Sequence, residues 1–184
     1  PPQPNSYYRH VLGGPVLWAP RAGAARLYVW RENDVLRSYR IGTGGFAGCV
    51  EKDAAPTALH RCDSDAVGGE MVDQHPGAFL TLSANGADPR SAIVWATAYR
   101  VVHGPGRLMA FAAQPRGGEL PKLWDSEACE EDAIDTGGDF VPPTVAYGRV
   151  YVATGGNTVD VFGLLANKVC TPVARPEAIG PIMQ

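Results

Sequence analysis

The four histidines are the side chains best suited to acid–base chemistry near neutral pH. They are His10, His60, His75 and His103, which are far apart in the sequence, and none lies in an H-x-H or H-E-x-x-H motif that would bind a metal ion. Ser83, in LSANG, lacks the G-x-S-x-G elbow of a hydrolase, and we expect its hydroxyl to bond the Asn85–Gly86 turn instead. We therefore assign no catalytic residue and no metal ligand, and whether the chain is an enzyme stays open.

A second candidate for chemistry is the acidic stretch DSEACEEDAIDTGGD, residues 125–139, which carries seven carboxylates. It lacks the D-x-D-x-D-G spacing of a calcium-binding EF-hand, so we interpret it as a solvated loop. GPGRL and TGGN are rich in glycine, but each joins two expected strands without the helix that a phosphate-binding loop needs. The sequence thus predicts no bound cofactor.

The composition is that of one globular domain. The chain has 184 residues, of which 45% are hydrophobic and 19% charged, and its 22 Gly and 16 Pro disfavour long helices. A net charge of -3 with scattered Lys and Arg argues against nucleic-acid binding. No apolar run approaches the roughly 18 to 20 residues of a membrane-spanning helix, so we expect no membrane span.

The four cysteines indicate the compartment. Cys49, Cys62, Cys129 and Cys170 all lie in polar or turn-rich stretches, with no C-x-x-C pair and no zinc-like spacing. An even number in such positions favours two disulfides and an exported protein, secreted or periplasmic. Of the three pairings we favour Cys49 with Cys62 and Cys129 with Cys170, and free thiols are the alternative.

Alternating apolar residues predict short antiparallel strands in three blocks of similar layout. Each block has a Gly- or Pro-led strand (GGPVLWA, GAFLTLSA, VPPTVAY), an apolar strand (RLYVW, AIVWA, RVYVA) and a third strand (DVLRSYRI, GRLMAFAA, NTVDVFGL). Only the second block clearly adds a fourth, KLWDS. Repeated four-stranded units indicate a β-propeller, and a β-sandwich is the alternative. The four tryptophans fall in these strands and are expected to pack between the sheets.

The predicted boundaries follow from these blocks. We expect an all-β chain with a partial β-propeller over residues 1–165 and a C-terminal tail over 166–184. The propeller part is divided into about three four-stranded antiparallel blades, at about 10–48, 77–126 and 139–165, with a loop excursion at 42–76.

The same segments resemble the pyrroloquinoline-quinone-like (PQQ-like) repeat family of β-propellers. GPGRLMAFAAQPRGGELPKLW is similar to the latter half of such a repeat, and VPPTVAYGRVYVATGGNTVDVFGL to the first half of the next. GPVLWAPRAGAARLYVWRENDVLRSYRI and LTLSANGADPRSAIVWATAYR extend the resemblance to about two thirds of the chain. The resemblance implies the C-terminal blades of a large exported bacterial protein. Quinone-binding members keep an adjacent cysteine pair and calcium ligands that this sequence lacks, so the resemblance is to the fold and not to the dehydrogenase activity.

About three blades do not close a ring, because propellers contain about four to eight. We therefore expect a second polypeptide, foremost the N-terminal part of the same precursor, to supply the remaining blades; self-assembly into a homo-oligomer is the alternative. His10, before an axis-facing strand, is the candidate to line a site at the axis. The predicted function is a non-catalytic scaffold or binding part. The alternatives are one chain of a processed two-chain enzyme, an oxidoreductase or hydrolase with its active site mainly on the partner, and a carbohydrate-binding propeller.

Overall fold

The chain folds into antiparallel β-sheets. The computed structural model describes residues 10–42, 45–46, 49–50, 61–62, 64–72, 76–86, 88–99, 104–164 and 170–173. Over these residues the regular structure is β-strand, apart from two short 3-10 helices, η1 (Ser126–Ala128) and η2 (Glu130–Asp132). The prediction of an all-β chain is confirmed.

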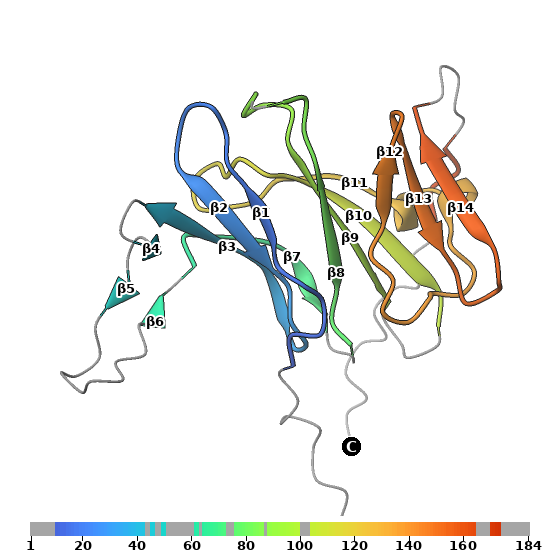
Figure 1. Cartoon of the computed structure of the whole chain (residues 1–184). Coiled ribbons are helices and arrows are strands. Elements are labelled where there is room, and N and C mark those ends of the chain that lie inside the picture. Colours follow the sequence, from blue (N-terminus) through green and yellow to red (C-terminus); the bar gives the residue numbers. More distant parts are fainter. Residues whose placement is uncertain are drawn as a thin grey trace, which may run out of the picture.

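Three sheets follow one another along the chain (Figure 1). The first contains β1 (Val16–Trp18), β2 (Ala25–Val29), β3 (Asp34–Gly42) and β7 (Ala66–Val72), with β4 (Gly45–Phe46) paired to the end of β3. The second contains β8 (Phe79–Ser83), β9 (Ile93–Tyr99), β10 (Gly106–Ala112) and β11 (Lys122–Asp125). The third contains β12 (Thr144–Ala146), β13 (Arg149–Ala153) and β14 (Val159–Gly163). A separate hairpin pairs β5 (Cys49–Val50) with β6 (Arg61–Cys62).

The structure differs from the expected loop excursion at residues 42–76. Strand β7 lies in this segment and pairs with β3 as the fourth strand of the first sheet. Its Gly-Gly pair disfavours a strand in the sequence. The structure requires a small residue there, because a Cβ on Gly68 would lie only 2.7 Å from the carbonyl oxygen of Leu120.

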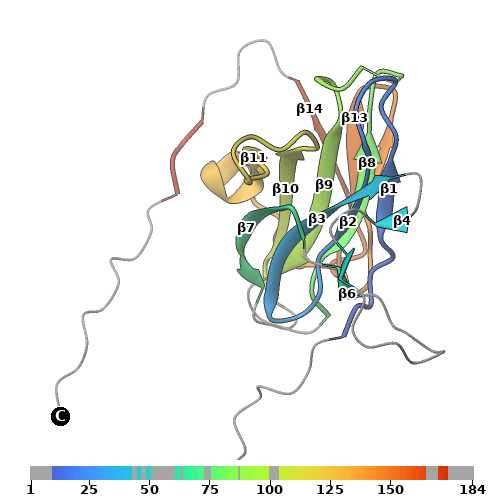
Figure 2. The ribbon, with the colours of Figure 1, turned by 90° about the vertical axis from the view of Figure 1, so that its left-hand side faces the viewer.

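The three sheets are stacked face to face, with the second between the other two (Figures 1 and 2). Strand β8, the first of the second sheet, contacts both β1 and β12, the first strands of its neighbours. The chain approaches itself closely just ahead of β1 and β8, since a Cβ on Gly13 would lie 2.7 Å from the carbonyl oxygen of Ala78. A glycine is therefore needed at position 13. Stacked sheets with adjacent first strands fit propeller blades.

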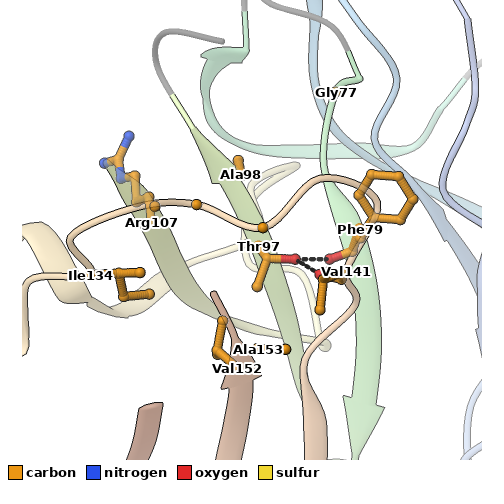
Figure 3. A pocket seen from close by; sticks show the side chains of 12 residues that line it. Gly77, Phe79, Thr97, Ala98, Arg107, Ile134, Val141, Val152 and Ala153 are labelled. Carbon is orange, nitrogen blue, oxygen red and sulfur yellow. Dashed lines mark hydrogen bonds between the residues drawn. The ribbon is translucent and has the colours of Figure 1, made fainter. Parts of the chain in front are cut away.

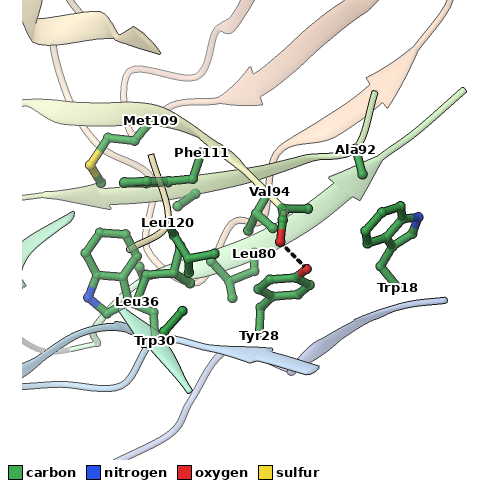
Figure 4. Packing of buried hydrophobic residues seen from close by; sticks show 14 of the residues in the cluster. Trp18, Tyr28, Trp30, Leu36, Leu80, Ala92, Val94, Met109, Phe111 and Leu120 are labelled. Carbon is green, nitrogen blue, oxygen red and sulfur yellow. Dashed lines mark hydrogen bonds between the residues drawn. The ribbon is translucent and has the colours of Figure 1, made fainter. Parts of the chain in front are cut away.

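Two apolar cores fill the spaces between the sheets. In the larger one, between the first and second sheets, the Trp30 and Phe111 rings meet edge to face at 5.7 Å, and the Tyr28 hydroxyl donates to the carbonyl oxygen of Ala113 at 2.7 Å (Figure 4). Trp18 belongs to the same core. The smaller core, between the second and third sheets, is formed by Leu108, Ile134, Val150 and Val152 with Trp95, Trp124, Val145 and Phe162 packed against it. The four tryptophans thus pack between the sheets, as predicted.

One predicted disulfide is confirmed. Cys129, after η1, is bonded to Cys170, with the two Cα atoms 5.1 Å apart. Glu131 supports the same contact, because its carboxylate accepts hydrogen bonds from the backbone and hydroxyl of Thr171. Cys49 and Cys62 are directly opposite each other in the β5–β6 register. Their side chains lie outside the described part of the chain, so that disulfide stays a prediction.

We expect Gly13→Ala to lower the free energy of unfolding by about 1–3 kcal/mol, because the new methyl group overlaps the backbone of β8. Gly14→Ala is the matched control, since a Cβ there meets no atom within 4 Å, and its effect should stay within about 0.5 kcal/mol. Urea unfolding of both variants measures the difference. Equal stability of the two would contradict the close approach of β1 and β8.

Replacing both Cys129 and Cys170 by Ser should lower the free energy of unfolding by about 2–4 kcal/mol. The disulfide joins residues 41 positions apart, and without it the unfolded chain gains the freedom of that loop. Guanidinium unfolding under non-reducing conditions gives the difference. An unchanged midpoint would show that the bond contributes nothing to stability.

Candidate functional site

A small cavity lies where the second and third sheets meet (Figure 3). Its walls include Phe79, Thr97, Arg107, Ile134, Val141 and Val152. The space within these walls holds about one water molecule. Pockets for small molecules are far larger, roughly 300–1,000 Å³. The cavity is therefore part of the interface between two packed sheets and not a substrate cleft. We call each such interface between neighbouring sheets a seam.

Thr97 closes this seam. It is buried on β9, and its Oγ1 lies 2.5 Å from the carbonyl oxygen of Val141 and 3.5 Å from that of Phe79 (Figure 3). The hydroxyl donates its proton to Val141, the nearer acceptor. Val141 lies in the segment leading into β12, so this bond sets the position of the third sheet against the second.

Arg107, beside the cavity on β10, is held by a buried ion pair. Its side chain is 7% exposed, and Nε and Nη2 donate to the two carboxylate oxygens of Asp125 at 3.0 and 2.5 Å. Lys122 Nζ donates to the same carboxylate at 2.7 Å, and Glu127 lies 3.3 Å from Arg107 Nε. The guanidinium is thus engaged by carboxylates of the chain itself.

The ion pairs also determine the protonation of two buried carboxylates. Burial alone would raise the pKa of Asp125, but hydrogen bonds from Arg107 and Lys122 lower the pKa to about 2. Asp34 behaves alike, since hydrogen bonds from Arg37 and Arg31 outweigh its burial and lower its pKa to about 2. A general acid or base works best with a pKa near the operating pH. Both groups are ionised structural partners at neutral pH.

His10 lies in the segment leading into β1. Its Nδ1 and its backbone nitrogen are both 3.1 Å from Oε2 of Glu32, and the backbone nitrogen of Glu32 donates to the His10 carbonyl oxygen at 3.1 Å. The Glu32 side chain is 1% exposed, and that of His10 is 52% exposed. These bonds attach the entry of β1 to the turn between β2 and β3.

The remaining histidines, His60, His75 and His103, lie outside the described residues. Within the part of the chain that the structure describes, no three His, Cys, Asp or Glu side chains gather around a metal-sized space. The same residues contain no helix long and apolar enough to cross a membrane.

Two expectations about polar residues need correction. Asp125 and Asp132 are buried, whereas Glu130, Glu131, Asp135 and Asp139 are exposed, so the stretch 125–139 is solvated only in part. Ser83 was expected to bond the Asn85–Gly86 turn; instead its Oγ accepts from Trp95 Nε1 at 2.9 Å, and the backbone of Asn85 donates to Ser91. For Ser83, a partner twelve positions along the chain replaces the local one.

The outer faces of the first and third sheets carry exposed apolar side chains. On β14, Val159 and Val161 are 58% and 51% exposed, while Phe162, between them and the strand end, packs toward the second sheet. On β1, Leu17 is 58% exposed. Tyr147, in the turn between β12 and β13, is 98% exposed with a positive φ of 51°. Sequence reasoning did not single out these residues, although the alternation along each strand was the available signal.

No family model, no curated protein and no solved structure matches this chain. The resemblance to PQQ-like repeats therefore remains an expectation from the sequence.

We expect Arg107→Met to lower the free energy of unfolding by about 3 kcal/mol at pH 7, because Asp125 keeps a buried charge without its main partner. The folded-state pKa of Asp125 is depressed, so the pair stabilises the wild-type chain above pH 4 and loses this effect as the pH falls toward 2. The gap between variant and wild type should therefore shrink at low pH. Urea unfolding at pH 7 and pH 3 measures it.

The control for this experiment is Arg90→Met. Arg90 is 91% exposed and lies 3.7 Å from Asp88, so its loss should change stability by less than about 0.5 kcal/mol at either pH. A destabilisation by Arg107→Met that is the same at pH 7 and pH 3 would contradict the electrostatic role of the pair.

Proposed function

We propose that the chain is the non-catalytic scaffold or binding part of an exported bacterial β-propeller of the PQQ-like type, assembled with a second polypeptide. The observation that supports this most is the pair of outer sheet faces with exposed Leu17, Val159 and Val161. In the middle sheet, apolar residues of both faces are covered by neighbouring sheets, although Leu123 on β11 is exposed.

The cost of leaving such faces in water supports assembly. Burial of apolar surface is worth roughly 25 cal/mol per Å², and contiguous exposed apolar patches mark interaction sites on soluble proteins. A sheet packed on each outer face would cover these side chains as the second sheet covers its neighbours. The disulfide between Cys129 and Cys170 fits an exported protein.

The polar groups favour a scaffold over an enzyme. Arg107, Asp125 and Asp34 are engaged by ion pairs within the chain, and the seam cavity is too small for a substrate. The tryptophans, which a carbohydrate-binding propeller would use as stacking platforms, pack in the two cores.

Native mass spectrometry of the protein from its natural source tests the proposal. We expect a mass well above the 19.5 kDa of one chain. Under denaturing conditions the complex should separate into this chain and a different polypeptide, or into copies of this chain alone if the second polypeptide is another copy. Hydroxyl-radical footprinting of the same sample should show Val159 and Val161 oxidised several-fold less than in the chain diluted until it is monomeric.

Leu123 on β11 is the internal control, because it is 55% exposed but lies on neither outer face and should be oxidised equally in both samples. A folded monomer of 19.5 kDa, or equal oxidation of Val159 and Val161 in both samples, would refute the proposal.

A further inference from the structure

The strand registers show that every sheet repeats the same two rows of side chains. Successive residues of a strand point to opposite faces, so each set of three paired residues across a sheet lies on one face. We call the set that faces the next sheet along the chain the forward row. The adjacent set, which faces the previous sheet, is the backward row.

The forward rows each have an aromatic residue on the second strand. In chain order they are Val16–Tyr28–Ser38, Thr81–Trp95–Ala110 and Thr144–Tyr151–Val161. The backward rows have two aliphatic residues followed by an aromatic one on the third strand. They are Leu17–Leu27–Tyr39, Leu82–Val94–Phe111 and Val145–Val150–Phe162.

A forward row packs against a backward row twice inside the chain. Tyr28 of the first sheet shares a core with Val94 and Phe111 of the second (Figure 4). Trp95 of the second sheet packs with Val150 and Phe162 of the third. The two seams therefore use the same kind of contact, with the aromatic of the forward row against the aliphatic residue and aromatic of the backward row.

This pattern leaves one row of each kind without a neighbouring sheet among the described residues. The backward row of the first sheet faces outward, with Leu17 58% exposed. The forward row of the third sheet faces outward on the other side of the stack, with Val161 51% exposed and Tyr151 half-buried. One outer face thus presents a backward row and the other a forward row, and these are the two kinds of row that pack against each other inside the chain.

We propose that a second copy of this chain occupies both faces, the third sheet of each copy packing on the first sheet of the other. The inference rests on the proposed function and identifies the second polypeptide, which the sequence leaves as either a different chain or another copy. Two copies of three sheets close a ring of six, within the range of about four to eight that propellers use. Because the two contacts are related by a two-fold axis, the assembly ends at two copies.

The row chemistry also argues against a dimer in which two third sheets meet. That arrangement would place forward row against forward row, a contact that neither seam of the chain contains. Thr144 and Tyr151 of one copy would then face the same polar atoms of the other, without the aliphatic residues that cover Tyr28 and Trp95.

Sedimentation velocity and native mass spectrometry of the 184-residue chain test the inference over a dilution series. We expect a species of twice 19.5 kDa that dissociates on dilution. Val161→Asp and Leu17→Asp each place a charge in the interface and should raise the dimer dissociation constant by at least about a hundredfold. Leu123→Asp is the matched control, because Leu123 on β11 has a similar exposure but lies on neither outer face, and it should leave the constant unchanged.

Mixing the two interface variants separates the proposed arrangement from other dimers. A mixed pair keeps one unaltered contact, between the third sheet of the Leu17→Asp copy and the first sheet of the Val161→Asp copy. The mixture should therefore recover dimer that neither variant forms alone. Circular dichroism of each variant establishes that it is folded.

Three outcomes would overturn the inference: a wild-type chain that is monomeric throughout the dilution series, a series of higher multiples, or a dimer that Val161→Asp abolishes and Leu17→Asp leaves intact. If the chain alone is monomeric and the natural complex contains a different polypeptide that protects Val161, the second copy is wrong and the proposed function stands. If the natural protein is also a monomer, the second copy and the proposed function are both wrong.

Discussion

A sheet with apolar side chains on both faces is stable in water only when both faces are covered, and this constraint organises the molecule. The second sheet meets it inside the chain, because Met109 and Phe111 face the first sheet while Leu108 and Trp95 face the third. The first and third sheets meet it on one face only. Leu17 and Val161 occupy positions whose counterparts in the second sheet are covered by a neighbouring sheet. They are exposed because no described sheet lies against their own faces.

The polar contacts between neighbouring sheets determine how the sheets are aligned more than they contribute to the attraction between them. A hydrogen bond contributes about 1 kcal/mol net, whereas a buried donor or acceptor without a partner costs more than that. The Tyr28 hydroxyl and the Thr97 hydroxyl each bind a backbone carbonyl of the adjoining segment. A sheet shifted along its neighbour would leave these groups buried and unpaired. The apolar rows thus provide the attraction between sheets, and these hydroxyls select one alignment.

The sequence predicted the strand blocks well because period-two alternation and turn residues are local signals. Three features needed the fold. Strand β7 is interrupted by glycines and lies in a polar segment, and its pairing with β3 depends on residues some 30 positions away. Arg107 and Asp125 are 18 positions apart and meet only because β10 and β11 pair. In the motifs RLYVW, AIVWA and RVYVA, Tyr28 and Tyr151 are the third residue and Trp95 is the fourth, so only the strand registers show that these aromatics occupy equivalent positions.

The shape of the seams explains why a stack of this kind curves. Near the first strands the sheets approach closely, since Gly13 leaves no room for a Cβ beside Ala78. Toward the outer strands large rings separate them: Trp30 meets Phe111 at 5.7 Å, and Trp124 meets Phe162 at 5.5 Å, both edge to face. The contact between the first and second sheets is therefore tight ahead of β1 and β8, and large rings fill both contacts farther out. When each interface turns the next sheet in the same direction, the rotations add as sheets are added. A further sheet on Tyr151 and Val161 would therefore continue the rotation about β1, β8 and β12. Curvature of this kind is what the proposed closed ring requires.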